Sequence, residues 1–118
     1  MTTYLGRDGT RHLQPQTEAQ WQRVVTRAAE QMGWEWMHIG RTGKYVSNGA
    51  KGTLGIGWPD LLLVSQRGII FVELKMDGEE LSAAQKHVRS CLLYAGAEYR
   101  VWRPSDFAQV MHELNGGA

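Results

Sequence analysis

Two short apolar runs joined by a four-residue turn constrain the fold more than any other feature of this chain. The runs are Leu61–Val64 and Ile69–Leu74, and Ser65-Gln66-Arg67-Gly68 separates them. Apolar runs of this length on either side of a Gly-containing turn predict a β-hairpin. Since neither run alternates polar and apolar residues, both faces of the hairpin are expected to be largely buried.

The hairpin would bring three charged side chains together at one of its ends. If Ser65 pairs with Gly68 around the turn, Asp60 lies opposite Glu73. Side chains opposed in this way have Cβ atoms about 4.5–5.5 Å apart, and like charges there are destabilising. Lys75 lies two residues beyond Glu73 and therefore points to the same face. A register shift of one residue would send Asp60 and Glu73 to opposite faces.

Two opposed carboxylates are tolerated most easily when a cation lies between them. Oxygen-only ligands favour a hard divalent ion such as Mg²⁺. Pro59 has a fixed φ angle and helps to set the chain direction at Asp60. The alternative interpretation is that Glu73 and Lys75 form an ordinary ion pair on an exposed strand end.

The rest of the chain predicts helices and strands around the hairpin. Thr17-Glu18-Ala19-Gln20 and Ser82-Ala83-Ala84-Gln85 have the form of capping boxes, which mark helix starts. Residue spacing and composition predict helices over 18–32 and 82–94, strands over 34–39 and 98–102, and a last helix that begins at 104–106. This order indicates one mixed α/β or α+β domain over 17–118, after a loose polar leader over 1–16.

The charged end of the hairpin resembles a known nuclease signature. Pro59-Asp60, twelve intervening residues and Glu73-Leu74-Lys75 look like the PD-(D/E)xK motif. More narrowly, Gly57–Leu61, Val72–Lys75 and Leu81–Gln85 resemble the virus-type replication-repair nuclease (VRR-NUC) family. Short stand-alone members of that family occur in phages and bacteria.

This resemblance covers most of the chain, from Glu18 to about Arg103. It implies a restriction-endonuclease-like core, in which helices flank a central mixed β-sheet. It also implies a deoxyribonuclease that depends on Mg²⁺ or Mn²⁺, with one or two ions per site. Such an ion polarises a phosphoryl oxygen and lowers the pKa of bound water.

The resemblance further assigns roles to the residues at the hairpin end. Asp60 and Glu73 match the metal-binding acids, and the Leu74 carbonyl would be a further ligand. Lys75 matches the lysine that helps to activate the attacking water and to stabilise the charge that develops on the phosphate.

Two residues outside the hairpin complete the catalytic set that the resemblance implies. Glu18 matches an acid on the first helix that contacts the metal, often through water. Gln85 matches a glutamine that completes the pocket from the following helix. Each residue also has a simpler explanation. Glu18 would be favourable at the positive helix N-terminus, and Gln85 could only cap its helix by reaching back to the Ser82 amide.

The glycine-rich segment 40–57 predicts an irregular loop whose backbone can approach a ligand closely. It contains three cations and no acid. We expect Arg41, Lys44 and Lys51 to neutralise DNA phosphates. Tyr45 could wedge into a DNA branch point. Charge alone fits a solvated loop equally well.

The family resemblance implies a structure-selective endonuclease that acts as a homodimer on branched DNA such as four-way junctions, in the manner of Holliday-junction resolvases in DNA repair. The net charge of +1 does not by itself indicate a nucleic-acid-binding protein. Two alternatives keep the same fold: a sequence-specific restriction-type endonuclease and a non-catalytic nucleic-acid-binding module. A P-loop or dinucleotide-binding motif is absent from the sequence.

Composition adds expectations about the core and the compartment. Most of the five tryptophans are expected to anchor a core or an interface rather than to stack on bases. Cys91 is the only cysteine, which excludes an internal disulfide and suggests the reducing cytosol. It is expected to be buried on an apolar helical face. The N-terminus lacks a signal-peptide pattern, and no apolar stretch reaches the roughly 20 residues that span a membrane.

Overall fold

The computed structural model describes residues 3–5, 11–39, 54 and 56–116. Its elements are β1 (Thr3–Leu5), β2 (Arg11–Leu13), α1 (Glu18–Gln31), β3 (Glu35–His38), β4 (Leu61–Ser65), β5 (Gly68–Leu74), α3 (Ala83–Tyr94), β6 (Glu98–Trp102), the 3₁₀ turn η1 (Pro104–Asp106) and α4 (Phe107–Leu114). Every helix and strand predicted over 18–114 is therefore present, with ends that differ by one or two residues.

The central sheet has four strands in the order β3-β4-β5-β6. The first three strands are antiparallel, and β6 joins β5 in parallel after the α3 crossover. The hairpin has the predicted register, because Ser65 pairs with Gly68 and Leu62 pairs with Phe71. The prediction of a mixed sheet flanked by helices is confirmed.

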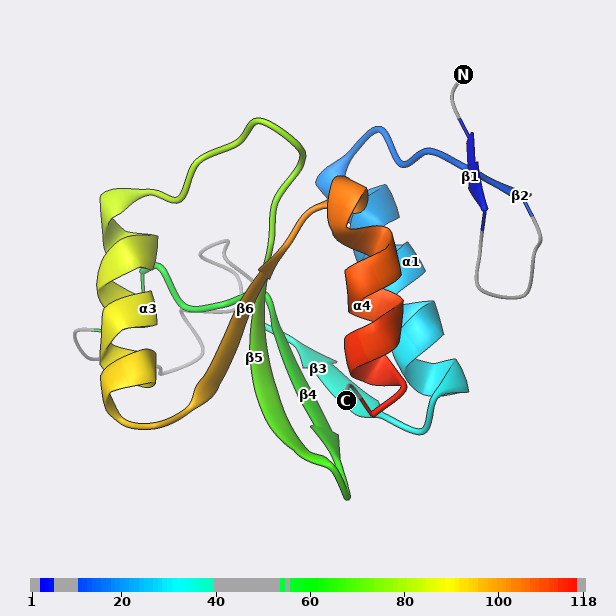
Figure 1. Ribbon diagram of the computed structural model, residues 1–118. Coiled ribbons are helices and arrows are strands. Elements are labelled where there is room, and N and C mark those ends of the chain that lie inside the picture. Colours follow the sequence, from blue (N-terminus) through cyan, green and yellow to red (C-terminus); the bar gives the residue numbers. More distant parts are fainter. Residues whose placement is uncertain (1–2, 6–10, 40–53, 55, 117–118) are drawn as a thin grey trace.

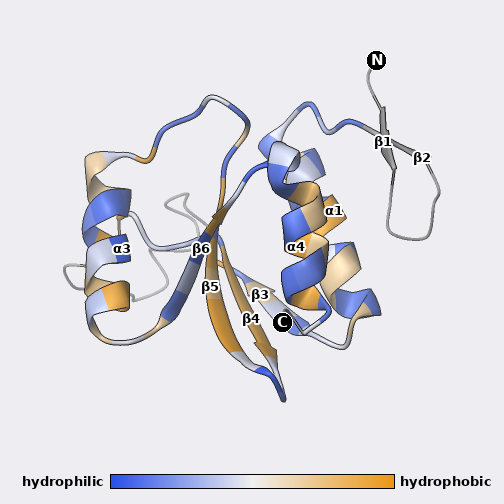
Figure 2. Ribbon diagram, viewed as in Figure 1, coloured by the Kyte–Doolittle hydropathy of each residue, from blue (hydrophilic) through white to orange (hydrophobic). Residues whose placement is uncertain are grey.

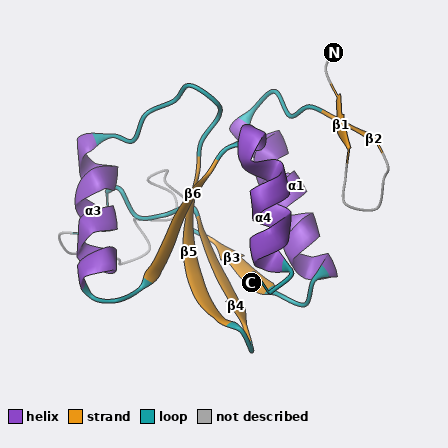
Figure 3. Cartoon of the chain, in the orientation of Figure 1, coloured by secondary structure: helices purple, strands orange, loops and turns teal. Residues whose placement is uncertain are grey.

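Helices cover the two faces of this sheet unequally. Figure 1 shows α3 on one side of the strands and the pair α1 and α4 on the other. The same division is visible by element type in Figure 3. In Figure 2, β4 and β5 are strongly hydrophobic where they run between the helices.

The hydrophobic core lies on the side of α1 and α4. Leu61, Leu63 and Val72 from the hairpin are fully buried there, together with residues of both helices. Near the turn the hairpin is less buried than predicted, because Val64 and Ile69 are 40% and 52% exposed. These two residues lie beside the turn, at the end of the hairpin far from Asp60.

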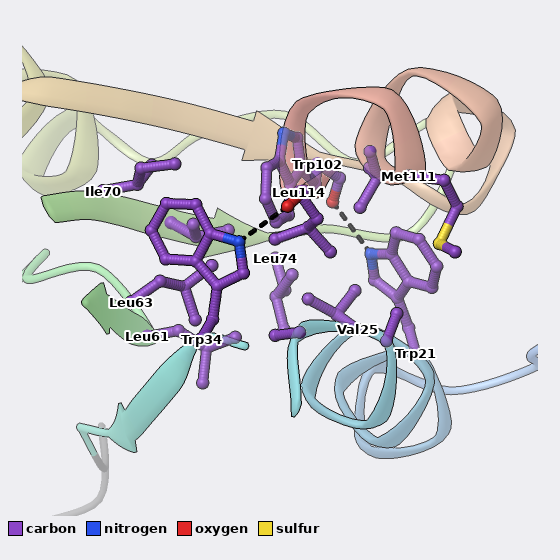
Figure 4. Packing of buried hydrophobic residues seen from close by; sticks show 14 residues of the cluster. Trp21, Val25, Trp34, Leu61, Leu63, Ile70, Leu74, Trp102, Met111 and Leu114 are labelled. Carbon is purple, nitrogen blue, oxygen red and sulfur yellow. Dashed lines mark hydrogen bonds between the residues drawn. The ribbon is translucent and has the colours of Figure 1, made fainter. Parts of the chain in front are cut away.

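Three tryptophans tie the core together (Figure 4). Trp21, Trp34 and Trp102 are nearly completely buried. The Trp21 indole donates to the Trp102 carbonyl at 2.9 Å, and the Trp34 indole donates to the Leu114 carbonyl at 2.8 Å. The polar edge of each ring is thus satisfied inside the core. These three tryptophans confirm the structural interpretation of the aromatic content.

Some local expectations were wrong. The segment predicted as a loose leader contains β1 and β2, which form a small antiparallel pair. The Gln20 side chain accepts from the Gln16 amide at 2.6 Å and does not complete a capping box, although Thr17 does cap α1. Cys91 was expected to be buried but is exposed. The buried residues of α3 are Gln85 and Val88, which lie in the N-terminal half of the helix. None of the described helices is both long and apolar enough to cross a membrane.

Candidate active site

Asp60 immediately precedes β4 and is held there by hydrogen bonds of its main chain and of its side chain. Its carbonyl accepts from the Ile39 amide at 2.7 Å, which extends the pairing of β3 with β4. Its carboxylate Oδ2 accepts from the Leu74 amide at 2.8 Å. Because Leu61 pairs with Val72, Asp60 lies one residue further along the same register, where Glu73 is its neighbour. The side chain is only 4% exposed.

Glu73 is completely buried beneath the N-terminal turn of α3. Its Oε2 accepts a hydrogen bond of 3.0 Å from the side-chain amide of Gln85. Gln85 is itself oriented by the helix cap, because its Oε1 accepts from the Ser82 amide at 2.8 Å. The Ser82 amide can only donate, so the Gln85 oxygen must face it and the NH₂ group must face Glu73. The two interpretations of Gln85 are therefore combined in one side chain.

Lys75 follows β5 and shares a face with Glu73. Its amide donates to the Trp102 carbonyl at 3.1 Å, and the same carbonyl accepts from the Trp21 indole. The side chain is 8% exposed and forms no salt bridge with any residue that the structure describes. An exposed Glu73–Lys75 ion pair, the simpler interpretation of this motif, is therefore not present.

Gly57 explains how the segment before Asp60 lies so close to α3. Its φ angle is +89°, in the region that favours glycine. A Cβ atom at this position would meet the Ala84 carbonyl oxygen at 2.4 Å and the Gln85 nitrogen at 2.8 Å. The glycine thus allows the two elements that carry Asp60 and Gln85 to touch through their backbones.

Tyr99 is a buried residue of this face that the sequence did not single out. It lies on β6 and pairs with Phe71, two residues before Glu73. Burial, and then the negative charge of Glu73, raise the pKa of Tyr99 to about 12, with a smaller contribution from Asp60. Arg89 on α3 acts in the opposite direction. No motif contains Tyr99, and only its strand position could have indicated it.

The other predicted site residues do not join Asp60 and Glu73 in the described structure. Glu18 is the first residue of α1 and is half-buried. In the described part of the chain, no three Asp, Glu, His or Cys side chains gather as a metal-binding group. Glu18 therefore does not join Asp60 and Glu73 in one cluster of direct ligands. Arg41, Lys44, Tyr45 and Lys51 lie outside the described residues.

The buried carboxylates still fit a magnesium-like ion. Magnesium commonly binds one or two carboxylates and completes its octahedral shell with water and substrate phosphate oxygens. Asp60 and Glu73 supply two such carboxylates, both nearly inaccessible to solvent and adjacent in register. Burial of two neighbouring negative charges is costly, and a cation between them would offset that cost.

A separate hollow of about 600 Å³ lies at the other end of the hairpin, beside Gly68 and Arg100. The arginine side chains that line it already form hydrogen bonds with other groups of the protein. Arg100 donates to Glu113, and Arg67 donates to the Leu114 carbonyl at 3.0 Å. These satisfied groups do not favour catalysis there, so the α3 face remains the better candidate.

Comparisons with known proteins add no further assignment. No family model, curated protein or solved structure matches this chain. The resemblance to the VRR-NUC family accordingly stays a prediction that rests on the motifs of the sequence itself.

Proposed function

We propose that this protein is a metal-dependent DNA endonuclease of the PD-(D/E)xK type. One observation carries the proposal. Asp60, Glu73 and Lys75 are all buried at one end of the sheet, on the face that α3 covers. Charged side chains are rarely buried unless they are paired or bind an ion. Two acids can hold a divalent ion that activates water, and a lysine can stabilise the charge that develops on the phosphate during hydrolysis.

The proposed roles follow from the hydrogen bonds of each side chain. A divalent ion, Mg²⁺ or Mn²⁺, would polarise a phosphoryl oxygen and acidify bound water. Asp60 and Glu73 would hold it, with the Leu74 carbonyl as a further ligand. Gln85 orients the Glu73 carboxylate by the bond at 3.0 Å. Lys75 has an ammonium group that is not engaged by a described acid, so it can meet the negative oxygens of the scissile phosphate.

The substrate in this proposal is branched DNA, and the active form is a homodimer. Both parts rest on the family resemblance. A two-fold symmetric dimer would present two sites to a branched substrate of similar symmetry. Glu18 would contact the metal through water from the start of α1. The loop cations Arg41, Lys44 and Lys51, with Tyr45, would contact the DNA.

The test is cleavage of labelled four-way junction, flap and plain duplex with Mg²⁺ or Mn²⁺. Wild type is compared with Lys75→Ala and with Lys86→Ala, a matched loss of an exposed lysine from α3. We expect metal-dependent junction cleavage that Lys75→Ala abolishes and Lys86→Ala retains.

Three other outcomes would change the proposal. Equal cleavage of every substrate would keep the nuclease and remove the branch selectivity. DNA binding without any cleavage would favour the non-catalytic binding module. A monomer by light scattering, with full activity, would remove the homodimer.

A further inference from the structure

Among the described residues, Tyr99 has a buried polar atom on the α3 face to which the proposed nuclease mechanism assigns no role. The residue is 7% exposed. Its hydroxyl oxygen is buried and has no hydrogen-bond partner among the described residues. A buried hydroxyl left in this state is destabilising, because no hydrogen bond compensates for the loss of its contact with water. A phenylalanine would fill the same space without that cost.

The position of Tyr99 relates its hydroxyl to the two carboxylates. Tyr99 is opposite Phe71 in the parallel pairing of β5 and β6, so both side chains point to the face that carries Glu73. The negative charges of Glu73 and Asp60 both act on the Tyr99 hydroxyl. The hydroxyl is thus buried on the side of the sheet that α3 covers, within the electrostatic reach of the two acids that would hold the ion.

We propose that Tyr99 is a positioning residue of the metal site, and that its hydroxyl hydrogen-bonds a water molecule that completes the shell of the ion. The inference rests on the proposed nuclease function. Asp60, Glu73 and the Leu74 carbonyl leave part of an octahedral shell to water. A metal-bound water donates hydrogen bonds, and the phenolic oxygen of Tyr99 accepts them. This bond would satisfy the buried hydroxyl that the protein alone does not.

The experiment measures Mn²⁺ binding by isothermal titration calorimetry on the whole protein without DNA. It compares wild type, Tyr99→Phe and the matched control Tyr94→Phe, whose tyrosine is 97% exposed at the end of α3. Outer-shell partners of metal ligands change affinity by about 10–100-fold. We expect Tyr99→Phe to weaken Mn²⁺ binding about tenfold and Tyr94→Phe to leave it unchanged.

Thermal unfolding separates positioning from a merely structural role. In the metal-free protein, Tyr99→Phe removes a buried hydroxyl without a partner, so the melting temperature should not fall. The increase of the melting temperature on adding Mn²⁺ should be smaller than in wild type. Equal Mn²⁺ affinity in wild type and Tyr99→Phe would overturn the inference while leaving the nuclease intact. If wild type neither binds Mn²⁺ nor cleaves DNA, the inference and the proposed function fail together.

Discussion

The two faces of the central sheet are built from alternate residues of the same strands, yet they bury opposite kinds of side chain. On β5, Val72 and Leu74 pack into the apolar core with α1 and α4. Glu73, between them, is fully buried on the other face and bonds to α3. Apolar burial stabilises the fold, whereas burial of charge opposes it. Packing on the core face therefore increases the free energy of unfolding, whereas the buried charges on the α3 face decrease it.

The helices attach to these faces by different means. On the core face, α1 and β6 are joined by the Trp21 indole and the Trp102 carbonyl, surrounded by apolar packing. On the other face, Gln85 ties α3 to the sheet through a hydrogen bond to a carboxylate. Places where a protein breaks local rules of burial are commonly functional. The contrast can be tested by changing one residue on each face.

Glu73→Gln should have the largest effect on function and little effect on folding. The amide keeps the shape and can still accept the bond from Gln85, but it removes a buried negative charge next to Asp60. If Glu73 holds the ion as proposed, its loss removes several kcal/mol of transition-state stabilisation, a decrease in cleavage rate on the order of 10³-fold. Without metal, the free energy of unfolding measured in urea should stay equal or increase.

The matched change on the core face is Leu63→Ala. Leu63 is fully buried among apolar residues, so its truncation should lower the free energy of unfolding by about 2–5 kcal/mol. Cleavage per folded molecule should be unchanged. If Glu73→Gln instead destabilised the protein as much as Leu63→Ala, the α3 face would have to be assigned to stability as well.

Gln85→Ala should have an intermediate effect, with a decrease of about tenfold in Mn²⁺ affinity. The change removes the bond that orients Glu73 and also the bond to the Ser82 amide. Ser82→Ala is the control, because it removes the hydroxyl that caps α3 at 3.1 Å but leaves the Gln85–Glu73 bond in place. It should cost about 1 kcal/mol of stability and leave calorimetric Mn²⁺ affinity unchanged. Equal losses of affinity in both variants would reduce Gln85 to a capping residue.

Much of this arrangement could be predicted because it depends on local chemistry. The turn Ser65–Gly68 fixed the hairpin register, and with it the approach of Asp60 to Glu73. The capping box at Ser82 predicted the start of α3 correctly. The sequence left two interpretations of Gln85, as a helix cap and as a site residue. The pattern could not decide between them because this one side chain makes both hydrogen bonds, to the Ser82 amide and to Glu73.

The features that could not be predicted depend on tertiary placement. Tyr99 reaches the α3 face because β6 pairs in parallel with β5, and no local pattern near residue 99 encodes that pairing. Cys91 was expected to be buried because it continues an apolar helical face. Burial on α3 is confined to Gln85 and Val88, and Cys91 is exposed, with its sulfur 3.7 Å from His87 Nε2.

A pH dependence should separate Tyr99 from an exposed tyrosine. Burial, together with the charges of Glu73 and Asp60, raises the pKa of Tyr99 to about 12 in the folded protein, against about 10 in the unfolded chain. The folded state thus retains a proton that the unfolded chain loses, and stability falls as the pH rises from about 10 to about 12. In metal-free protein, urea unfolding across this range should show a shallower decline for Tyr99→Phe than for wild type. Tyr94→Phe should follow the wild-type curve, and a Tyr99→Phe curve that did the same would mean that the carboxylates and the burial of the α3 face do not act on this hydroxyl.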